Sequence, residues 1–281
     1  MTSAINIFDN NGVKYRTLKD NQDSLIVFYL PYRPFIYEND EFEIDSYYLA
    51  SNKLHGLEKS IINADKANGI NTEIYDGYYK QILERLSVGK ILKNNLLATP
   101  DGSNVVLGIL KTDGLDRDYD TIPHTDVECI NCDACISACG MGALENGYER
   151  IKCVRNSMDT LDFNLNDFEY TGKSILGCNR CRIVCPLNKS DYVRPPEIMA
   201  ENLKAEKFLN DVLSGKKGIS WLTDLIGVNY VRPVRMLSLA LIAVYNKRYD
   251  NCLKYVEQAL SHQDERVRRI AKLVLDSYKR S

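Results

Sequence analysis

The sequence predicts an α+β protein in three parts, and three observations carry this prediction. Strand-like and helical patterns alternate over residues 1–119, as in an α/β domain. Eight of the nine cysteines fall between Cys129 and Cys185, inside a second predicted domain at residues 120–195. Residues 196–281 then show apolar side chains at helical spacing, which predicts an α-helical domain.

Strands and helices are expected in alternation in the first domain. The β-rich apolar run at 24–30 is stopped by a proline and predicts a buried strand. Residues 45–68 have mostly helical spacing, and further strands are expected at 72–75 and 105–110. The domain lacks both a Gly-x-Gly-x-x-Gly motif and a P-loop motif, so the sequence indicates no Rossmann or P-loop nucleotide site.

The cysteines of the central part form two runs. The first, Cys129–Cys139, has the spacing C-x2-C-x2-C-x3-C of bacterial ferredoxins, in which three cysteines bind one cubane and the fourth reaches a second cluster. The second run, Cys178–Cys185, repeats the x2 and x3 steps and ends in Cys-Pro, but it lacks a first cysteine. Cys153, between the runs, is the substitute.

Counting ligands predicts two 4Fe-4S clusters that use all eight cysteines. The predicted cluster 1 ligands are Cys129, Cys132, Cys135 and Cys185, and those of cluster 2 are Cys139, Cys153, Cys178 and Cys181. Zinc is an alternative, although zinc sites usually use two CxxC pairs, which the C-x3-C steps fit poorly. Disulfides are a second alternative. The N-terminal residues show no secretory signal, so we expect reduced thiols and a cytoplasmic location.

The 24 residues between Cys153 and Cys178 are predicted to form a surface loop with a short helix. In the third domain, helices are expected at 197–213, 219–225, 234–246, 249–261 and 265–278, and the last of them resemble HEAT-type repeats. No apolar run approaches the roughly 20 residues that span a bilayer, so no membrane partner is expected.

Charge is distributed unevenly along the chain. Residues 229–281 contain eleven Lys or Arg against five Asp or Glu, a net charge of +6, whereas the whole chain carries −2. A basic segment of this kind indicates a polyanionic partner, and nucleic acid is the first candidate. A solvated helical face explains the charge equally well. The predicted nucleic-acid contacts are Arg232, Arg235, Arg248, Arg266, Arg268 and Arg269.

Taken together, these features resemble the epoxyqueuosine reductase family over about residues 24–281. Both cysteine runs, the cysteine between them and the HEAT-like end match the family's order. The other matching segments are Leu30-Pro31-Tyr32-Arg33-Pro34, Asp76 with Leu83-Glu84-Arg85, Lys93-Asn94-x-Leu96-Leu97-x-Thr99-Pro100 and Leu107-Gly108-Ile109-Leu110-x-Thr112-Asp113. The chain departs from the family in a shorter start, in lacking proline after Asp76, and in Gly140 after Cys139.

The resemblance implies a cobalamin-dependent oxidoreductase acting on tRNA. The first domain would be cobalamin-binding-like, with Lys93 and Asn94 in cofactor binding, and the ferredoxin-like clusters would deliver electrons from a flavodoxin or ferredoxin. The reaction would remove the epoxide oxygen of epoxyqueuosine, giving queuosine. Asp76 would donate a proton, a role that calls for a partly buried carboxyl with a raised pKa. Its alternative is a solvated turn aspartate before Gly77. Two other functions stay open: a cobalamin-dependent reductase of a small molecule, and an iron-sulfur electron carrier.

Overall fold

The structure, a computed structural model, describes residues 3–19, 24–124, 126–189 and 191–279. The chain divides into two compact units. Unit 1 comprises Met1–Arg33, Leu49–Cys135 and Cys181–Ser190, and unit 2 comprises Pro34–Tyr48, Ile136–Arg180 and Asp191–Ser281. The division into three domains at residues 119 and 195 stays a prediction. No helix in the described ranges is long and apolar enough to cross a membrane.

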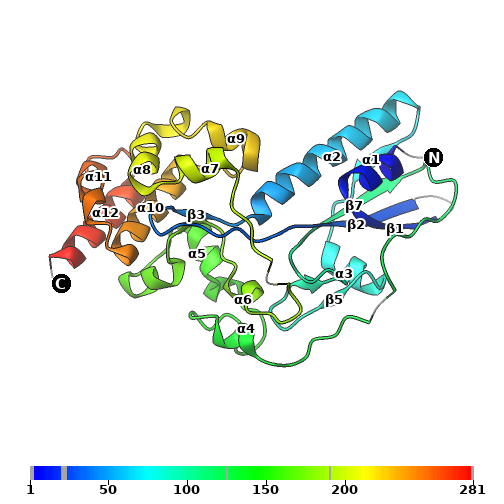
Figure 1. Ribbon diagram of the computed structural model, residues 1–281, viewed down its shortest axis with the longest axis horizontal. Coiled ribbons are helices and arrows are strands. Elements are labelled where there is room, and N and C mark those ends of the chain that lie inside the picture. Colours follow the sequence, from blue (N-terminus) through cyan, green and yellow to red (C-terminus); the bar gives the residue numbers. More distant parts are fainter. Residues whose placement is uncertain (1–2, 20–23, 125, 190, 280–281) are drawn as a thin grey trace. The chain divides into compact units, whose positions relative to one another are not determined.

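Unit 1 is built on a four-stranded antiparallel sheet with the order β1-β2-β7-β4 (Figure 1). The strands are β1 (Lys14–Leu18), β2 (Ser24–Pro31), β7 (Val105–Thr112) and β4 (Thr72–Ile74). Three of these strands confirm the predictions at 24–30, 72–75 and 105–110. The predicted helix at 45–68 is confirmed as α2 (Tyr47–Ala67). The first helix, α1 (Ala4–Asn11), and β1 were not predicted.

The two faces of this sheet are covered by different elements. On one face, α1 and α2 pack over β2 and β7, and the Phe8 and Phe28 rings lie 4.6 Å apart. On the other face, Val27, Tyr29 and Ile109 form an apolar core with α3 (Tyr79–Arg85) and with the hairpin of β5 (Lys90–Ile91) and β6 (Leu97–Ala98). Because successive strand residues point to opposite faces of the sheet, β2 contributes Phe28 to one core and Val27 and Tyr29 to the other.

Unit 2 surrounds α10 (Pro233–Lys247), whose residues from Met236 to Val244 are all buried. The other elements are β3 (Glu43–Ile44), η1 (Arg150–Lys152), α5 (Val154–Thr160), η2 (Leu165–Thr171), β8 (Ser174–Leu176), α7 (Glu197–Asn202), α8 (Ala205–Leu213), η3 (Gly215–Lys217), α9 (Trp221–Ile226), η4 (Asp250–Cys252), α11 (Leu253–Ala259) and α12 (Glu265–Tyr278). Two short helices, α4 (Ala134–Ser137) and α6 (Arg180–Ile183), lie where the chain passes from one unit to the other. The HEAT-like character of the last helices stays a prediction.

Two sequence predictions in unit 2 are wrong. The segment after Cys153 contains the predicted short helix, α5, but it is not a surface loop, because Phe163 and Phe168 are at most 1% exposed and β8 pairs with β3 in parallel. The predicted helix at 197–213 is two helices. It breaks because the chain at Leu203 turns to pair with residues 40–42: the Phe42 amide donates to the Leu203 carbonyl over 2.8 Å.

Candidate iron-sulfur site

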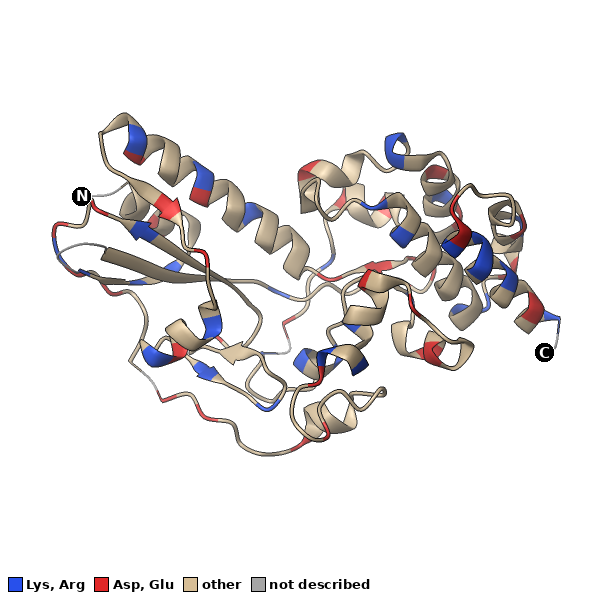
Figure 2. Ribbon diagram, turned by 180° about the vertical axis from the view of Figure 1, so that it is seen from behind, with Lys and Arg blue, Asp and Glu red and all other residues tan. Residues whose placement is uncertain are grey.

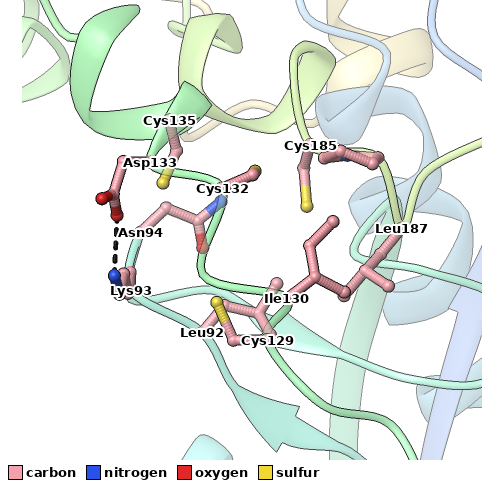
Figure 3. A pocket seen from close by; sticks show the side chains of 11 residues that line it. Leu92, Lys93, Asn94, Cys129, Ile130, Cys132, Asp133, Cys135, Cys185 and Leu187 are labelled. Carbon is pink, nitrogen blue, oxygen red and sulfur yellow. Dashed lines mark hydrogen bonds and ion pairs between the residues drawn. The ribbon is translucent and has the colours of Figure 1, made fainter.

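The four cysteines predicted for cluster 1 line one pocket of unit 1 (Figure 3). Its lining comes from three segments of chain, namely residues 92–94, residues 129–135 and residues 185–187. Cys132 is exposed and the other three cysteines are partly buried. Two of these segments, distant in the sequence, carry the four soft sulfur ligands, a donor set that fits a 4Fe-4S cluster. This placement supports the assignment of cluster 1, which stays a prediction.

The segment that carries Cys129, Cys132 and Cys135 is wound tightly. Asn131 and Asp133, on either side of Cys132, both have left-handed backbone conformations, with φ of 55° and 56°. Asn and Asp tolerate this region better than other residues that carry a Cβ, so the residue types suit the turn. The winding lets three thiols separated by only two residues face a common space.

The fourth thiol reaches the pocket from a loop that an asparagine fixes. Asn188 Oδ1 accepts a hydrogen bond from the Ser103 amide over 2.6 Å, and Asn188 Nδ2 donates to the Arg182 carbonyl over 2.6 Å. Gly102 is required beside it, because a Cβ there would lie 2.6 Å from Asn188 Oδ1. Sequence reasoning missed Asn188, although its position three residues after Cys185 was a usable signal.

Burial raises the pKa of the Cys185 thiol, an effect that a hydrogen bond with the Leu187 backbone opposes. Nearby Cys132 and Cys129 raise this pKa further, since a thiolate is disfavoured beside other negative sulfurs. Iron binding needs thiolates, so the charge of a bound cluster's iron would have to offset this cost.

Lys93 and Asn94, which the resemblance places in cofactor binding, both line this pocket. Lys93 Nζ lies 2.7 Å from Asp133 Oδ1, and this hydrogen bond raises the pKa of Lys93, as do the charges of Cys129 and Cys135. Its exposed ammonium has further donors that can reach a ligand at the pocket rim. Lys93 therefore fits a cofactor contact.

Asn94 fits direct cofactor contact poorly. It is only 4% exposed, and both ends of its amide have partners: Nδ2 donates to the Cys181 carbonyl over 3.2 Å, and Oδ1 accepts from the Leu96 amide over 3.2 Å. Its side chain joins the pocket loop to the backbone of a predicted cluster 2 ligand. A role in positioning cysteines therefore suits Asn94 better than contact with a corrin.

The cysteines predicted for cluster 2 are divided between the units. Cys139, Cys153 and Cys178 belong to unit 2, and Cys181 is counted with unit 1. Burial raises the pKa of the Cys178 thiol, a hydrogen bond with the Arg180 backbone opposes this, and the charge of Cys153 raises the pKa further. The assignment of cluster 2 stays a prediction.

Asp76 lies in the turn between β4 and α3 and is exposed. Within the described part of the chain, its carboxylate has no hydrogen-bond or ion-pair partner. The adjacent Gly77 has no room for a side chain, because a Cβ would lie 2.3 Å from the Tyr75 ring. The partial burial expected of a general acid is not present in this turn. Any such burial would have to come from a bound ligand, and the catalytic role of Asp76 stays a prediction.

All six arginines predicted to bind nucleic acid already have partners inside unit 2. Arg235 pairs with Asp159 over 2.6 Å, and Arg269 donates to the Leu161 carbonyl over 2.8 Å. The remaining contacts are Arg232 with the Asn229 carbonyl, Arg248 over the Tyr245 and Tyr278 rings, Arg266 with Asp264, and Arg268 with the His262 and Gln263 carbonyls. Figure 2 shows acidic residues interspersed among the basic ones on these helices.

Comparison with known proteins identifies the class of the central region first. Residues 128–188 match the 4Fe-4S double cluster binding domain family. The cysteine runs thus lie in an iron-sulfur domain that holds two 4Fe-4S clusters, as the sequence predicts.

Several similar curated proteins are named epoxyqueuosine reductase. The enzyme of Bacillus subtilis is 31% identical over 140 residues, covering 48% of this chain and 36% of the relative. That of Listeria monocytogenes is 33% identical over 134 residues, covering 44% and 35%. The chain therefore aligns with about a third of the length of these curated relatives. The predicted resemblance to this family is confirmed.

Solved structures agree in fold. Epoxyqueuosine reductase from Streptococcus thermophilus superposes with a TM-score of 0.64 at 19% identity, covering 91% of this chain and 82% of that one. A crystal structure of epoxyqueuosine reductase with an epoxyqueuosine-modified tRNA stem loop gives 0.64 at 21% identity, covering 88% and 71%. The mixed α/β fold with a double-cluster domain is confirmed.

Proposed function

We propose that the protein is an iron-sulfur oxidoreductase that reduces the epoxide of epoxyqueuosine in tRNA to the alkene of queuosine. The observation that carries this proposal is the convergence of Cys129, Cys132, Cys135 and Cys185 on one pocket, in a domain that matches a double-cluster family. The names of the relatives and the tRNA stem loop bound to a protein of the same fold support the substrate.

The chemistry requires two electrons and two protons. An epoxide that becomes an alkene loses both of its C–O bonds, and the oxygen leaves as water. The two clusters are one-electron carriers that together hold the electron pair. Cobalamin, when bound, supplies a strongly reducing cobalt centre for this kind of reduction. Within this chain, Lys93 fits a contact to such a cofactor and Asp76 would protonate the oxygen.

The first domain would be cobalamin-binding-like, the last helices HEAT-like, and the protein cytoplasmic, with a flavodoxin or ferredoxin as the electron donor. The basic segment would hold tRNA phosphates. Because Arg266 and Arg232 bond to residues nearby in the chain, we expect them to reach RNA more readily than Arg235 and Arg269, which hold distant segments of unit 2.

An iron-sulfur electron carrier is the second candidate, favoured by the exposure of Asp76. The two functions are separated by one assay. Anaerobically purified protein is given reductant, cobalamin and epoxyqueuosine-containing tRNA, and its nucleosides are analysed by mass spectrometry. Queuosine should form with the wild type and not with Cys185→Ser. A wild type that carries both clusters, retains no cobalamin and forms no queuosine would favour the carrier.

Binding of RNA is tested separately. The affinity for an epoxyqueuosine-modified stem loop should fall with rising salt, and Arg232→Ala with Arg266→Ala should flatten that dependence. Lys53→Ala with Lys59→Ala, at two exposed positions of α2 in unit 1, is a charge-matched control and should leave the affinity unchanged. Affinity that responds neither to salt nor to the arginine variants would contradict an RNA-binding role for this segment.

A further inference from the structure

An exposed apolar side chain lies two residues before a predicted ligand of cluster 2. Ile151, in the middle of η1, is 80% exposed, and Tyr148, just before η1, is 44% exposed. Two residues of chain span at most about 7 Å, so Ile151 lies close to Cys153, which is itself only partly buried. Two large apolar side chains in water beside a metal ligand indicate a surface that a partner covers.

The turn that presents Ile151 is held in place by hydrogen bonds on both sides of Cys153. The Cys153 amide donates to the Arg150 carbonyl over 3.1 Å, and the Asn156 amide donates to the Cys153 carbonyl over 2.8 Å. Arg150 Nε also donates to Asn156 Oδ1 of α5, over 3.3 Å. Because this turn is already ordered, a partner that binds to it has little chain to immobilise.

Tyr148 extends from this surface to the sulfur of Cys153. Its hydroxyl makes a hydrogen bond with the Cys153 side chain. Burial raises the pKa of Tyr148, the charge and the hydrogen bond of Cys153 raise it further, and the charges of Arg150 and Arg155 oppose this. A protein in contact with the Tyr148 ring would therefore touch a side chain that itself touches a predicted cluster ligand. This is a short path for an electron.

Basic side chains lie on both sides of Ile151. Arg150 and Lys152 are exposed. Lys152 Nζ lies 2.7 Å from Glu149 Oε1, and this bond raises the pKa of Lys152, as does the charge of Glu145. Exposed ion pairs of this kind contribute little to stability, so carboxylates of a partner can replace the contact with Glu149. An apolar centre between two exposed cations fits an acidic protein surface.

We propose that Tyr148 and η1 form the docking site of an acidic one-electron carrier protein that reduces cluster 2 beside Cys153. The inference rests on the proposed function. Cluster 1 shares its pocket with Lys93, the proposed cofactor contact, which leaves cluster 2 to take up electrons from outside. Each docking event oxidises the carrier by one electron and reduces cluster 2 by one electron. Two such events supply the two electrons of epoxide removal.

RNA fits this surface less well than a protein does. The side chain that protrudes furthest, Ile151, is a branched aliphatic group, which offers a base neither an aromatic face for stacking nor a hydrogen bond. An aliphatic group can instead pack against the apolar centre of a protein interface.

The test measures reduction of the clusters in the full chain by reduced flavodoxin and by reduced plant-type ferredoxin, two acidic one-electron carriers. Anaerobic stopped flow without tRNA follows the loss of cluster absorption. The bimolecular rate constant should fall as salt rises, and Arg150→Gln with Lys152→Gln should lower it and flatten its dependence on salt. Ile151→Glu should lower it about 10- to 100-fold, because an apolar contact is replaced by a charge of the carrier's own sign.

Matched controls come from other exposed positions of unit 2. Ile198→Glu on α7, where the side chain is 50% exposed, should keep the wild-type rate constant. Lys216→Gln with Lys217→Gln, which removes two exposed cations from η3, should keep it as well. Titanium(III) citrate, a small reductant that needs no docking site, should fully reduce the clusters of every variant, and iron content should be unchanged. These readouts distinguish lost docking from a damaged cluster.

The outcomes separate the docking site from the proposed function. Wild-type rate constants in Ile151→Glu and in the Arg150 and Lys152 double variant would overturn the docking site alone, as would a wild type that neither carrier reduces. Weaker binding of a tRNA stem loop in these variants, with unchanged reduction rates, would assign the surface to RNA instead. If the carriers reduce the wild type and not the η1 variants, yet no queuosine forms, the docking site stands and the proposed substrate is wrong.

Discussion

The side-chain amide of Asn94 donates a hydrogen bond to the backbone carbonyl of Cys181, over 3.2 Å. The same asparagine lines the pocket of the four cluster 1 cysteines. Asn94 therefore links the predicted cluster 1 pocket to the backbone of Cys181, a predicted ligand of cluster 2. Its Oδ1 also holds the Leu96 amide. The pocket loop and the second cysteine run are thereby joined within unit 1.

Replacing Asn94 by alanine should leave the Cys181 carbonyl and the Leu96 amide without partners. We expect a loss of about 1–3 kcal/mol in the free energy of unfolding, because buried polar groups that lose their partners cost roughly this much. Urea unfolding of the anaerobic protein measures it. Asn63→Ala, at an exposed position of α2, is the control and should change stability by less than about 0.5 kcal/mol. Equal stabilities for the two variants would argue against the positioning role.

Asn188 allows a finer dissection of the loop that carries Cys185. Asn188→Asp keeps the oxygen that accepts from the Ser103 amide but loses the donor to the Arg182 carbonyl, whereas Asn188→Ala loses both. Iron bound per chain after anaerobic reconstitution should therefore fall in the order wild type, aspartate, alanine. If the alanine variant binds as much iron as the wild type, the hydrogen bonds of Asn188 are not needed to position this loop.

The pair formed by Glu41 and Arg194 in unit 2 predicts a dependence of stability on pH. Glu41 is 1% exposed, and Arg194 binds both of its oxygens, at 2.6 and 2.9 Å. Burial acts to raise the pKa of Glu41, but the bonds from Arg194 and from the Glu38 amide prevail and lower it. Its stabilising contribution is therefore present above the pKa of an unfolded glutamate, roughly 4.3, and is lost as pH falls below that value.

Arg194→Gln should remove this contribution. The loss at pH 7 should be about 1–3 kcal/mol, less than for a fully buried pair because the Arg194 side chain is 43% exposed. Between pH 5 and pH 3 the wild type should lose more stability than the variant, which urea unfolding at each pH would show. Arg194→Lys keeps the charge without the two-point geometry and should be intermediate. Parallel pH curves for wild type and glutamine variant would disprove the linkage.

Lys93 should tune the electron affinity of cluster 1. Its ammonium lies at the pocket that Cys129 and Cys135 line, and a positive charge there favours the reduced, more negative cluster. Lys93→Gln should thus lower the cluster 1 reduction potential by tens of millivolts, measured by a redox titration followed by electron paramagnetic resonance. Lys90→Gln, at an exposed position of β5, should leave the potential where it is. A potential unchanged in both variants would place Lys93 outside the electrostatic reach of the cluster.

Sequence pattern predicted the elements whose signals are local. The apolar run at 24–30 and the helical spacing at 265–278 correspond to β2 and α12, because strand and helix periodicity act over a few residues. Pairing between segments far apart in the sequence could not be predicted from these local patterns. The break at Leu203 depends on residues 40–42, about 160 positions away, and Phe168 is buried against Tyr245 of α10. The sequence around these residues has no local pattern that would indicate such contacts.

The site shows the same limit. Cysteine spacing predicted the ligands of cluster 1 because the short gaps between cysteines are typical of one cluster type. The structure brings those four residues to one pocket. Asn188 carries no motif, and its role depends on Ser103, which only the folded chain brings near. For Asp76 the sequence supplied a position, and the expected burial is not found there.

We expect the chain to hold two 4Fe-4S clusters whose ligands cross between the cysteine runs. Iron and acid-labile sulfide in the anaerobically purified wild type should each number about eight per chain. Cys185→Ser should keep about four of each and lose the signal of cluster 1, whereas Cys139→Ser should keep about four and lose that of cluster 2. Zinc without sulfide in the wild type would contradict the presence of the clusters, and Cys185→Ser removing the same cluster as Cys139→Ser would contradict the crossing of ligands.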